Sequence, residues 1–76
     1  MCFDEYDIER YIVNEIRNLR NKKGMTQEDL AKKCGVHQQE ISRIESQRTS
    51  PSLKKISKML NALDCQIIIK DKGDIE

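Results

Sequence analysis

Apolar residues recur along the first part of the chain with the period of one face of a helix. Between residues 4 and 23 they are spaced by four, four and three positions: Ile8, Ile12, Ile16 and Leu19. Acids cluster in the first turns of this segment and bases in the last, which suits the helix dipole. The pattern predicts a first helix from about Asp4 to Lys23, ended by Gly24 in a left-handed conformation.

Two shorter helical patterns follow. Thr26 is a typical N-cap with acids in the next turn, so a second helix is expected over Thr26–Cys34. Gly35 supplies the left-handed residue that ends it. A third helix begins near His37 or Gln38 and ends near Ser46. The expected inward residues of these two helices are Leu30, Ala31, Cys34, Val36, Ile41 and Ile44.

The only proline introduces the last helical pattern. Ser50 as N-cap and Pro51 at the first helical position predict a fourth helix there. Its apolar positions, spaced by three, four and three, are Leu53, Ile56, Leu60 and Leu63, with Met59 beside them. Residues 65–70, CQIIIK, are short and β-branched, and they predict a strand.

Two short helices joined by a tight turn that contains glycine form a helix-turn-helix. The chain places such a unit at about residues 26–46. In this arrangement the first short helix lies across the DNA backbone and presents the second to the major groove. We therefore expect an all-α, four-helix domain, formed by residues 1–76 as a single unit.

The net charge of +1 conceals an uneven distribution. Residues 16–60 carry eleven bases and four acids, a net charge of +7, whereas residues 1–15 carry −4 and residues 61–76 carry −2. A basic middle favours a polyanionic partner. The acidic ends favour a basic protein or no partner at all.

The stretch GMTQEDLAKKCGVHQQEISRIESQRTSPSLKKISKMLNAL resembles the Cro and lambda-repressor type of helix-turn-helix, the XRE family, over roughly Ile16–Leu63. The resemblance implies a lambda-repressor-like domain. It also implies DNA base reading by the exposed residues at the start of the third helix and one turn on, namely Gln38, Gln39, Ser42 and Arg43. Arg20 and Glu45 match a structural ion pair between the first and third helices.

Further residues are expected to contact phosphate and so to set the register on DNA without reading sequence. They are Gln27, His37, Ser46, Arg48 and Lys54. The family usually has Gly at the position of Gln47 and Ser or Thr at that of His37, so the loops around the third helix are the weakest part of the match. For His37, a solvent-facing cap is the main interpretation and phosphate contact the second.

The chemistry of these side chains agrees with the resemblance. A Gln amide can pair with adenine N7 and N6, and Arg can pair with guanine O6 and N7. The alternative is that Gln38, Gln39 and Arg43 are simply solvated residues of an exposed helix face.

After NAL the family usually continues with Gly and a fifth helix, but here Asp64 and CQIIIK follow. This ending resembles HipB-like and HigA-like antitoxins, in which a C-terminal strand can pair across a dimer. A lone strand leaves backbone groups unpaired, so we expect dimerisation through Ile67, Ile68 and Ile69. Two alternatives stay open: these isoleucines pack on the chain's own helices, or they pair with a different protein.

The expected function is a cytoplasmic, sequence-specific transcriptional regulator, a homodimeric repressor that reads a palindromic operator in double-stranded DNA. The alternative is an antitoxin that neutralises a toxin protein and represses its own operon, with the acidic residues 4–9 and the acidic tail as docking surfaces. No paired carboxylates, nucleophile–base pair, phosphate-binding Gly loop or metal-ligand spacing suggests an enzyme, a cofactor or a metal. The three cysteines are expected to be reduced, and no apolar run is long enough to span a membrane.

Overall fold

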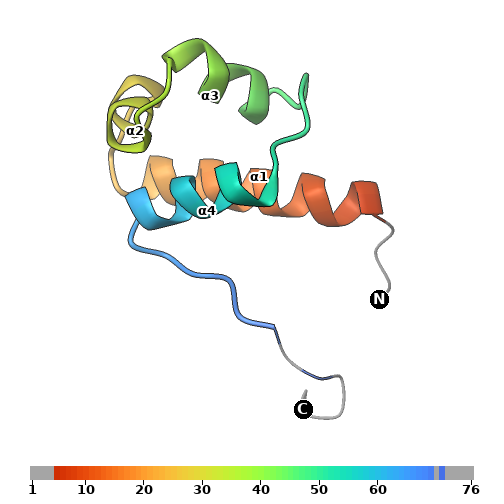
Figure 1. Ribbon diagram of the computed structural model, residues 1–76. Coiled ribbons are helices and arrows are strands. Elements are labelled where there is room, and N and C mark those ends of the chain that lie inside the picture. Colours follow the sequence, from red (N-terminus) through yellow and green to blue (C-terminus); the bar gives the residue numbers. More distant parts are fainter. Residues whose placement is uncertain (1–4, 70, 72–76) are drawn as a thin grey trace.

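The computed structural model describes residues 5–69 and 71, and this part of the chain contains four helices. They are α1 (Glu5–Lys22), α2 (Gln27–Cys34), α3 (Gln38–Glu45) and α4 (Leu53–Ala62). In Figure 1, α2 and α3 lie together on one side of α1 and α4, and the segment after α4 runs away from the helices. The predicted all-α, four-helix class is confirmed, and a three-residue turn joins α2 to α3.

One core holds the four helices together. Ten apolar side chains are at most 8% exposed, and every helix contributes to them: Val13, Ile16, Leu30, Ala31, Ile41, Ile44, Ile56, Met59, Leu60 and Leu63. Burying a Val, Leu, Ile or Met side chain stabilises a fold by about 1.5–3 kcal/mol relative to leaving it exposed. The core therefore fixes the angle at which α3 crosses α2.

Two of the expected core positions are exposed. Ile8 is 47% exposed and Leu53 is 78% exposed, whereas Met59, expected only beside the apolar face of α4, is fully buried. Leu53 is the first residue of α4, and helical side chains point back toward the N-terminus. Its side chain therefore projects past the edge of the core.

The start of α4 differs from the prediction. The N-cap is Ser52, whose hydroxyl accepts a hydrogen bond from Lys55 N at 3.1 Å. Ser50, the expected cap, donates its hydroxyl to Glu9 Oε2 on α1 at 3.1 Å instead. Ser-Pro-Ser offers two possible caps, and the contact with α1 selects the second. Pro51 therefore precedes the helix.

The N-terminus of α2 forms as predicted and closes a capping box. Asp29 N donates to Thr26 Oγ1, and Thr26 N donates to Asp29 Oδ2, both at 3.0 Å. Two hydrogen bonds hold the pKa of the Asp29 carboxyl below its ordinary value. The larger effect comes from the Thr26 backbone and the smaller from the Thr26 side chain. The box is therefore complete at neutral pH and weakens as pH falls through that lowered pKa.

All four helices end in the same way, with a left-handed residue after the last turn. These residues are Gly24, Gly35, Gln47 and Asp64, with φ of 70°, 73°, 63° and 57°. After each, the backbone N–H of the next residue donates to the carbonyl five residues before it, as in Met25 N to Arg20 O at 3.0 Å and Arg48 N to Arg43 O at 2.9 Å. Gln47 thus ends α3 in the conformation that Gly24 and Gly35 adopt after α1 and α2.

Gln47→Gly should raise the free energy of unfolding by about 0.5–1 kcal/mol. Glycine removes the left-handed strain of about 1–2 kcal/mol. It also raises the conformational entropy of the unfolded protein, which offsets part of that gain. Urea titration followed by circular dichroism measures the change. As a control, Gly35→Ala should be destabilising, since no atom lies within 4 Å of an added Cβ and only the backbone (φ +73°) opposes it. A loss of stability in Gln47→Gly would contradict the strain argument.

The predicted strand over residues 65–70 is absent from the part of this single chain that the structure describes. Residues 65–69 leave α4 as an extended segment after Cys65 N bonds to Leu60 O at 2.8 Å (Figure 1). Lys70 lies outside the described residues. A strand requires a neighbouring strand for its backbone hydrogen bonds, and no described residue of the same chain supplies one.

Candidate nucleic-acid interface

The turn between α2 and α3 sets the exposure of the start of α3. Gly35 takes the left-handed conformation, and His37 then acts as N-cap with extended backbone but without a side-chain hydrogen bond. The imidazole of His37 is exposed. The first turn of α3 is therefore presented at the surface.

The helix α3 has two distinct faces. Ile41 and Ile44 are buried, with exposures of 0% and 2%. The four residues predicted to read bases are all exposed on the other side: Gln38, Gln39, Ser42 and Arg43. None of these four side chains makes a hydrogen bond or ion pair with another described residue, so their donors and acceptors are free for a ligand.

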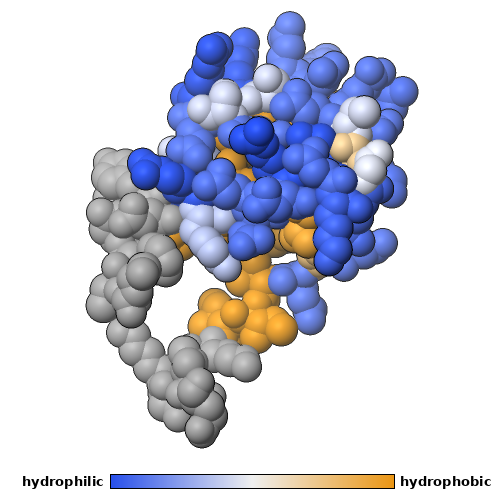
Figure 2. Space-filling model, turned by 180° about the vertical axis from the view of Figure 1, so that it is seen from behind, coloured by the Kyte–Doolittle hydropathy of each residue, from blue (hydrophilic) through white to orange (hydrophobic). Residues whose placement is uncertain are grey.

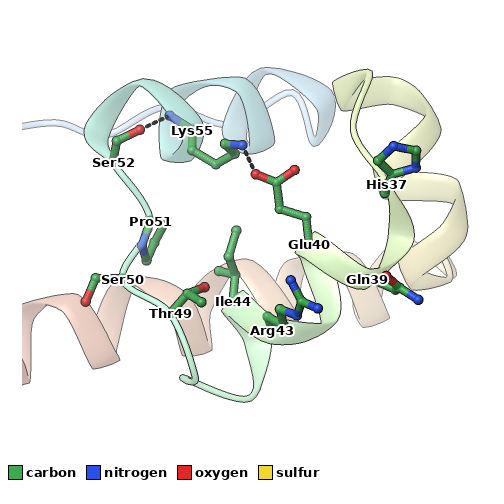
Figure 3. Close-up of a pocket in the computed structure, with 10 residues that line it drawn as sticks. All are labelled: His37, Gln39, Glu40, Arg43, Ile44, Thr49, Ser50, Pro51, Ser52 and Lys55. Carbon is green, nitrogen blue, oxygen red and sulfur yellow. Dashed lines mark hydrogen bonds and ion pairs between the residues drawn. The ribbon is translucent and has the colours of Figure 1, made fainter.

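Both acids of α3 are neutralised by bases from other helices. Glu40 pairs with Lys55 of α4, as Figure 3 shows. At the other end of α3, Arg20 of α1 binds the Glu45 carboxylate through two hydrogen bonds, Nε to Oε2 at 2.7 Å and Nη2 to Oε1 at 2.9 Å. Arg43 therefore carries the one uncompensated charge of α3.

Arg20 and Glu45 form the centre of a buried polar network. Arg20 is 8% exposed and Glu45 is 6% exposed. Arg20 Nη1 also donates to Met25 O at 2.7 Å, and Gln27 Nε2 donates to Glu45 Oε1 at 3.2 Å. The network ties α1 and the start of α2 to the end of α3. Among the described residues, no buried side-chain nitrogen or oxygen lacks a partner.

The residues predicted to contact phosphate lie around α3 and differ in exposure and in hydrogen bonding. Gln27 is half-buried and uses one amide N–H on Glu45, which leaves its second N–H available. Ser46 is exposed, and its hydroxyl donates to Arg43 O at 3.2 Å. Arg48 and Lys54 are exposed in the loop after α3 and in the first turn of α4.

Two open hollows flank α3. The larger, about 480 Å³, is lined by residues of α3, by the loop from Thr49 to Ser52, and by Lys55; Figure 3 shows Gln39, Glu40 and Arg43 on its α3 side. The smaller, about 260 Å³, lies between α1, α2 and α3 and includes Arg17.

Sequence reasoning assigned no role to Arg17 or Lys55. Arg17 is three residues before Arg20 on the basic end of α1, but its proximity to α3 depends on how α1 packs. Lys55 was only one of several bases in α4, and no sequence pattern indicated that it pairs with Glu40. Both assignments require the tertiary contacts.

The isoleucines predicted to dimerise are exposed. Ile67 is 50% exposed, Ile68 67% and Ile69 93%. Ile67 and Ile69, but not Ile68, line a groove of about 380 Å³ along α4 that also includes Leu53. Figure 2 shows this hydrophobic segment against an otherwise largely hydrophilic face. Packing of the isoleucines on the chain's own helices is therefore incomplete.

Other kinds of site find no support in residues 5–69 and 71. No group of three metal-ligating side chains gathers there, and no helix in that range has the length and apolarity to cross a membrane.

Cys34 and Cys65 are free thiols. Burial raises the pKa of the Cys34 thiol, which matches its expected role as a small packing residue. The two predicted toxin-docking surfaces, the acidic residues 4–9 and the acidic tail, lie mostly outside the residues whose side chains the structure describes.

The sequence is similar to those of known helix-turn-helix regulators and antitoxins. Over 63 residues the chain is 41% identical to an uncharacterised HTH-type transcriptional regulator of Archaeoglobus fulgidus, covering 79% of this chain and 90% of that protein. It is 30% identical to antitoxin HipB of Escherichia coli K12 over 71 residues, covering 93% and 81% of the two chains. It is also 37% identical to a hypothetical transcription factor of Neisseria meningitidis. That match covers 79% of this chain but only 57% of the length of the Neisseria protein.

Solved structures show the same fold. The crystal structure of the Neisseria transcription factor matches with a TM-score of 0.75 at 33% identity, over 87% of this chain and 76% of that one. A chain of the HipA–HipB–O2–O3 complex matches with a TM-score of 0.77 at 26% identity, over 95% and 96% of the two chains. A helix-turn-helix family model matches residues 16–69. The protein is therefore a member of the XRE family of helix-turn-helix proteins.

Proposed function

We propose that this protein is a sequence-specific DNA-binding transcriptional regulator that reads an operator through α3. The supporting observation is the outer face of α3, which carries four exposed hydrogen-bonding side chains, while both of its acids are neutralised from other helices. An unpaired carboxylate on this face would repel DNA phosphates. With Glu40 and Glu45 paired, α3 offers amides, a hydroxyl and one guanidinium.

These groups suit the major groove. The groove is wide enough for an α-helix, and its base edges present donors and acceptors in a pattern that differs for each base pair. Gln38 and Gln39 can pair with adenine, and Arg43 can pair with guanine. Arg48 and Lys54 would contact the phosphates beside the groove without reading sequence.

The exposed isoleucines support a homodimer and hence a palindromic operator. A single α3 reads only a few base pairs, whereas two copies related by a two-fold axis read two half-sites about 34 Å apart. Among the described residues, none forms a backbone hydrogen bond with residues 66–69, and the three isoleucine side chains are at least half exposed. Pairing with a second copy would remove both features.

Selection of bound sequences from a random pool of double-stranded DNA tests this function. We expect a palindromic consensus whose half-site centres lie about one helical turn apart. A consensus with a single half-site would refute the dimeric arrangement but not DNA reading. Recovery of no consensus, with affinity that does not respond to salt, would refute the function itself.

Arg43→Ala should weaken binding to the selected operator by about 1–3 kcal/mol and remove the preference at one base pair of each half-site. Arg48→Ala is the matched comparison, because it removes the same charge from a residue assigned to phosphate. It should weaken binding to all sequences alike. Fluorescence anisotropy on operators with single base changes separates the two patterns. Equal losses on every sequence for Arg43→Ala would contradict base reading.

The similarity to HipB motivates a second candidate, an antitoxin that binds a toxin protein and regulates its own operon. HipB carries the name antitoxin, and a similar chain is found with HipA in a solved complex. Co-expression of this protein with the product of a neighbouring gene tests the candidate. A stable complex that relieves growth inhibition would support it, and a neighbour that neither binds nor inhibits growth would refute it.

A further inference from the structure

The smaller hollow beside α3 has the composition of an anion site. It is lined by Arg17, Arg20, Gln27, Ser42, Glu45 and Ser46, which come from the first three helices and the cap of α3. We propose that it binds one phosphodiester group of the DNA backbone, with Arg17 as the principal ligand. This inference rests on the proposed function and adds to it a contact from α1, outside the helix-turn-helix unit.

The one acid in this hollow is already compensated. Both oxygens of Glu45 accept hydrogen bonds from the Arg20 guanidinium, and Oε1 also accepts one from Gln27. Arg20 in turn uses its remaining terminal nitrogen on Met25 O. The Arg20–Glu45 pair is therefore neutral and satisfied, and Arg17 supplies the net positive charge of the hollow.

Arg17 itself is available for a ligand. It is exposed and makes no hydrogen bond or ion pair with any other described residue. A free guanidinium presents five N–H donors in a planar fork that fits two oxygens of a phosphate. Gln27 lines the same hollow, and its second amide N–H adds a neutral donor.

The position of the hollow matches the geometry of a helix in the major groove. Gln39 and Arg43 line the larger hollow, whereas Ser42 and Ser46 line the smaller one, so the two hollows lie on different sides of α3. A helix in the groove has a sugar–phosphate strand on each side. With α3 in the groove, the smaller hollow would face one DNA strand, and the loop after α3 would face the other.

The test compares Arg17→Ala with Lys58→Ala on the selected operator and on unrelated duplex DNA. Lys58 is a matched control because it carries the same charge but lines a hollow between α2 and α4 that includes no residue of α3. Arg17→Ala should weaken binding to both duplexes about 10-fold. It should also reduce the slope of log affinity against log salt by about 0.9, the value of one phosphate contact. Lys58→Ala should leave both quantities unchanged.

A duplex with a single neutral methylphosphonate identifies the phosphate. At one position per half-site, this replacement should weaken the binding of the unmodified protein and leave that of Arg17→Ala unchanged. Arg17→Gln, which keeps most of the side-chain stem, should behave as Arg17→Ala does, and thermal melts should show all variants folded.

The outcomes separate this inference from the proposed function. If the unmodified protein binds DNA with the expected salt response but Arg17→Ala matches Lys58→Ala, the phosphate site is wrong and the function stands. If Arg17→Ala changes the preference at a base pair rather than the salt slope, Arg17 reads sequence and the inference is also overturned. If the unmodified protein binds no DNA, both fail.

Discussion

Glu45→Ala should lower the free energy of unfolding by about 3–5 kcal/mol, the usual effect of removing one partner from a buried ion pair. Arg20 is 8% exposed and would keep its charge with Met25 O as its only remaining partner. Small domains have total stabilities of about 5–15 kcal/mol. The variant is therefore expected to be close to unfolding at 25 °C, as measured by urea titration followed by circular dichroism.

A double substitution distinguishes the ion pair from simple packing. Arg20→Met with Glu45→Leu replaces both charges by apolar groups and should recover most of the stability lost in Glu45→Ala. Gln27→Ala, which removes only the 3.2 Å hydrogen bond to Glu45, should cost about 0.5–1.5 kcal/mol. A loss of less than 1 kcal/mol in Glu45→Ala would instead mean that the pair behaves like a solvated surface pair.

Ile68→Asp should convert the proposed dimer to a monomer and reduce operator affinity by about 10²–10⁴-fold, since the second half-site is no longer bound by a linked copy. Ile68 is 67% exposed, and it does not line the groove along α4 that its two neighbours border. The substitution should therefore leave the helical fold intact. Sedimentation gives the mass relative to the 8.9 kDa chain, and anisotropy gives the affinity.

Ile68→Val is the matched control at this position. Valine keeps the branched apolar side chain and the strand propensity, so this variant should remain a dimer with nearly unchanged affinity. If Ile68→Asp also remains a dimer, the C-terminal segment is not the interface. If the unmodified chain sediments as a monomer and still selects a palindrome, dimerisation occurs only on DNA.

The sequence by itself determined the local structure where the deciding interactions are short in range. Thr26 and Asp29 are three residues apart, and their capping box sets the start of α2. Gly24 and Gly35 mark the ends of α1 and α2, because the left-handed conformation costs glycine little. The apolar period predicted the buried face of α3 and therefore its outward face, whereas the base-reading role of four outward side chains came from the family resemblance. Ser-Pro-Ser was ambiguous, since either serine can cap a helix.

Only the tertiary structure decided what depends on contacts between helices. Ser50 contacts Glu9 across 41 positions, which leaves Ser52 as the cap of α4. Lys55 neutralises Glu40, and the packing of α1 places Arg17 beside α3; neither follows from spacing along the chain. The isoleucine segment needs a partner strand, and residues 5–69 and 71 of the single chain supply none. Periodicity and caps act within a few residues, whereas the charge and shape of the DNA-facing surface are set by side chains brought together from different helices.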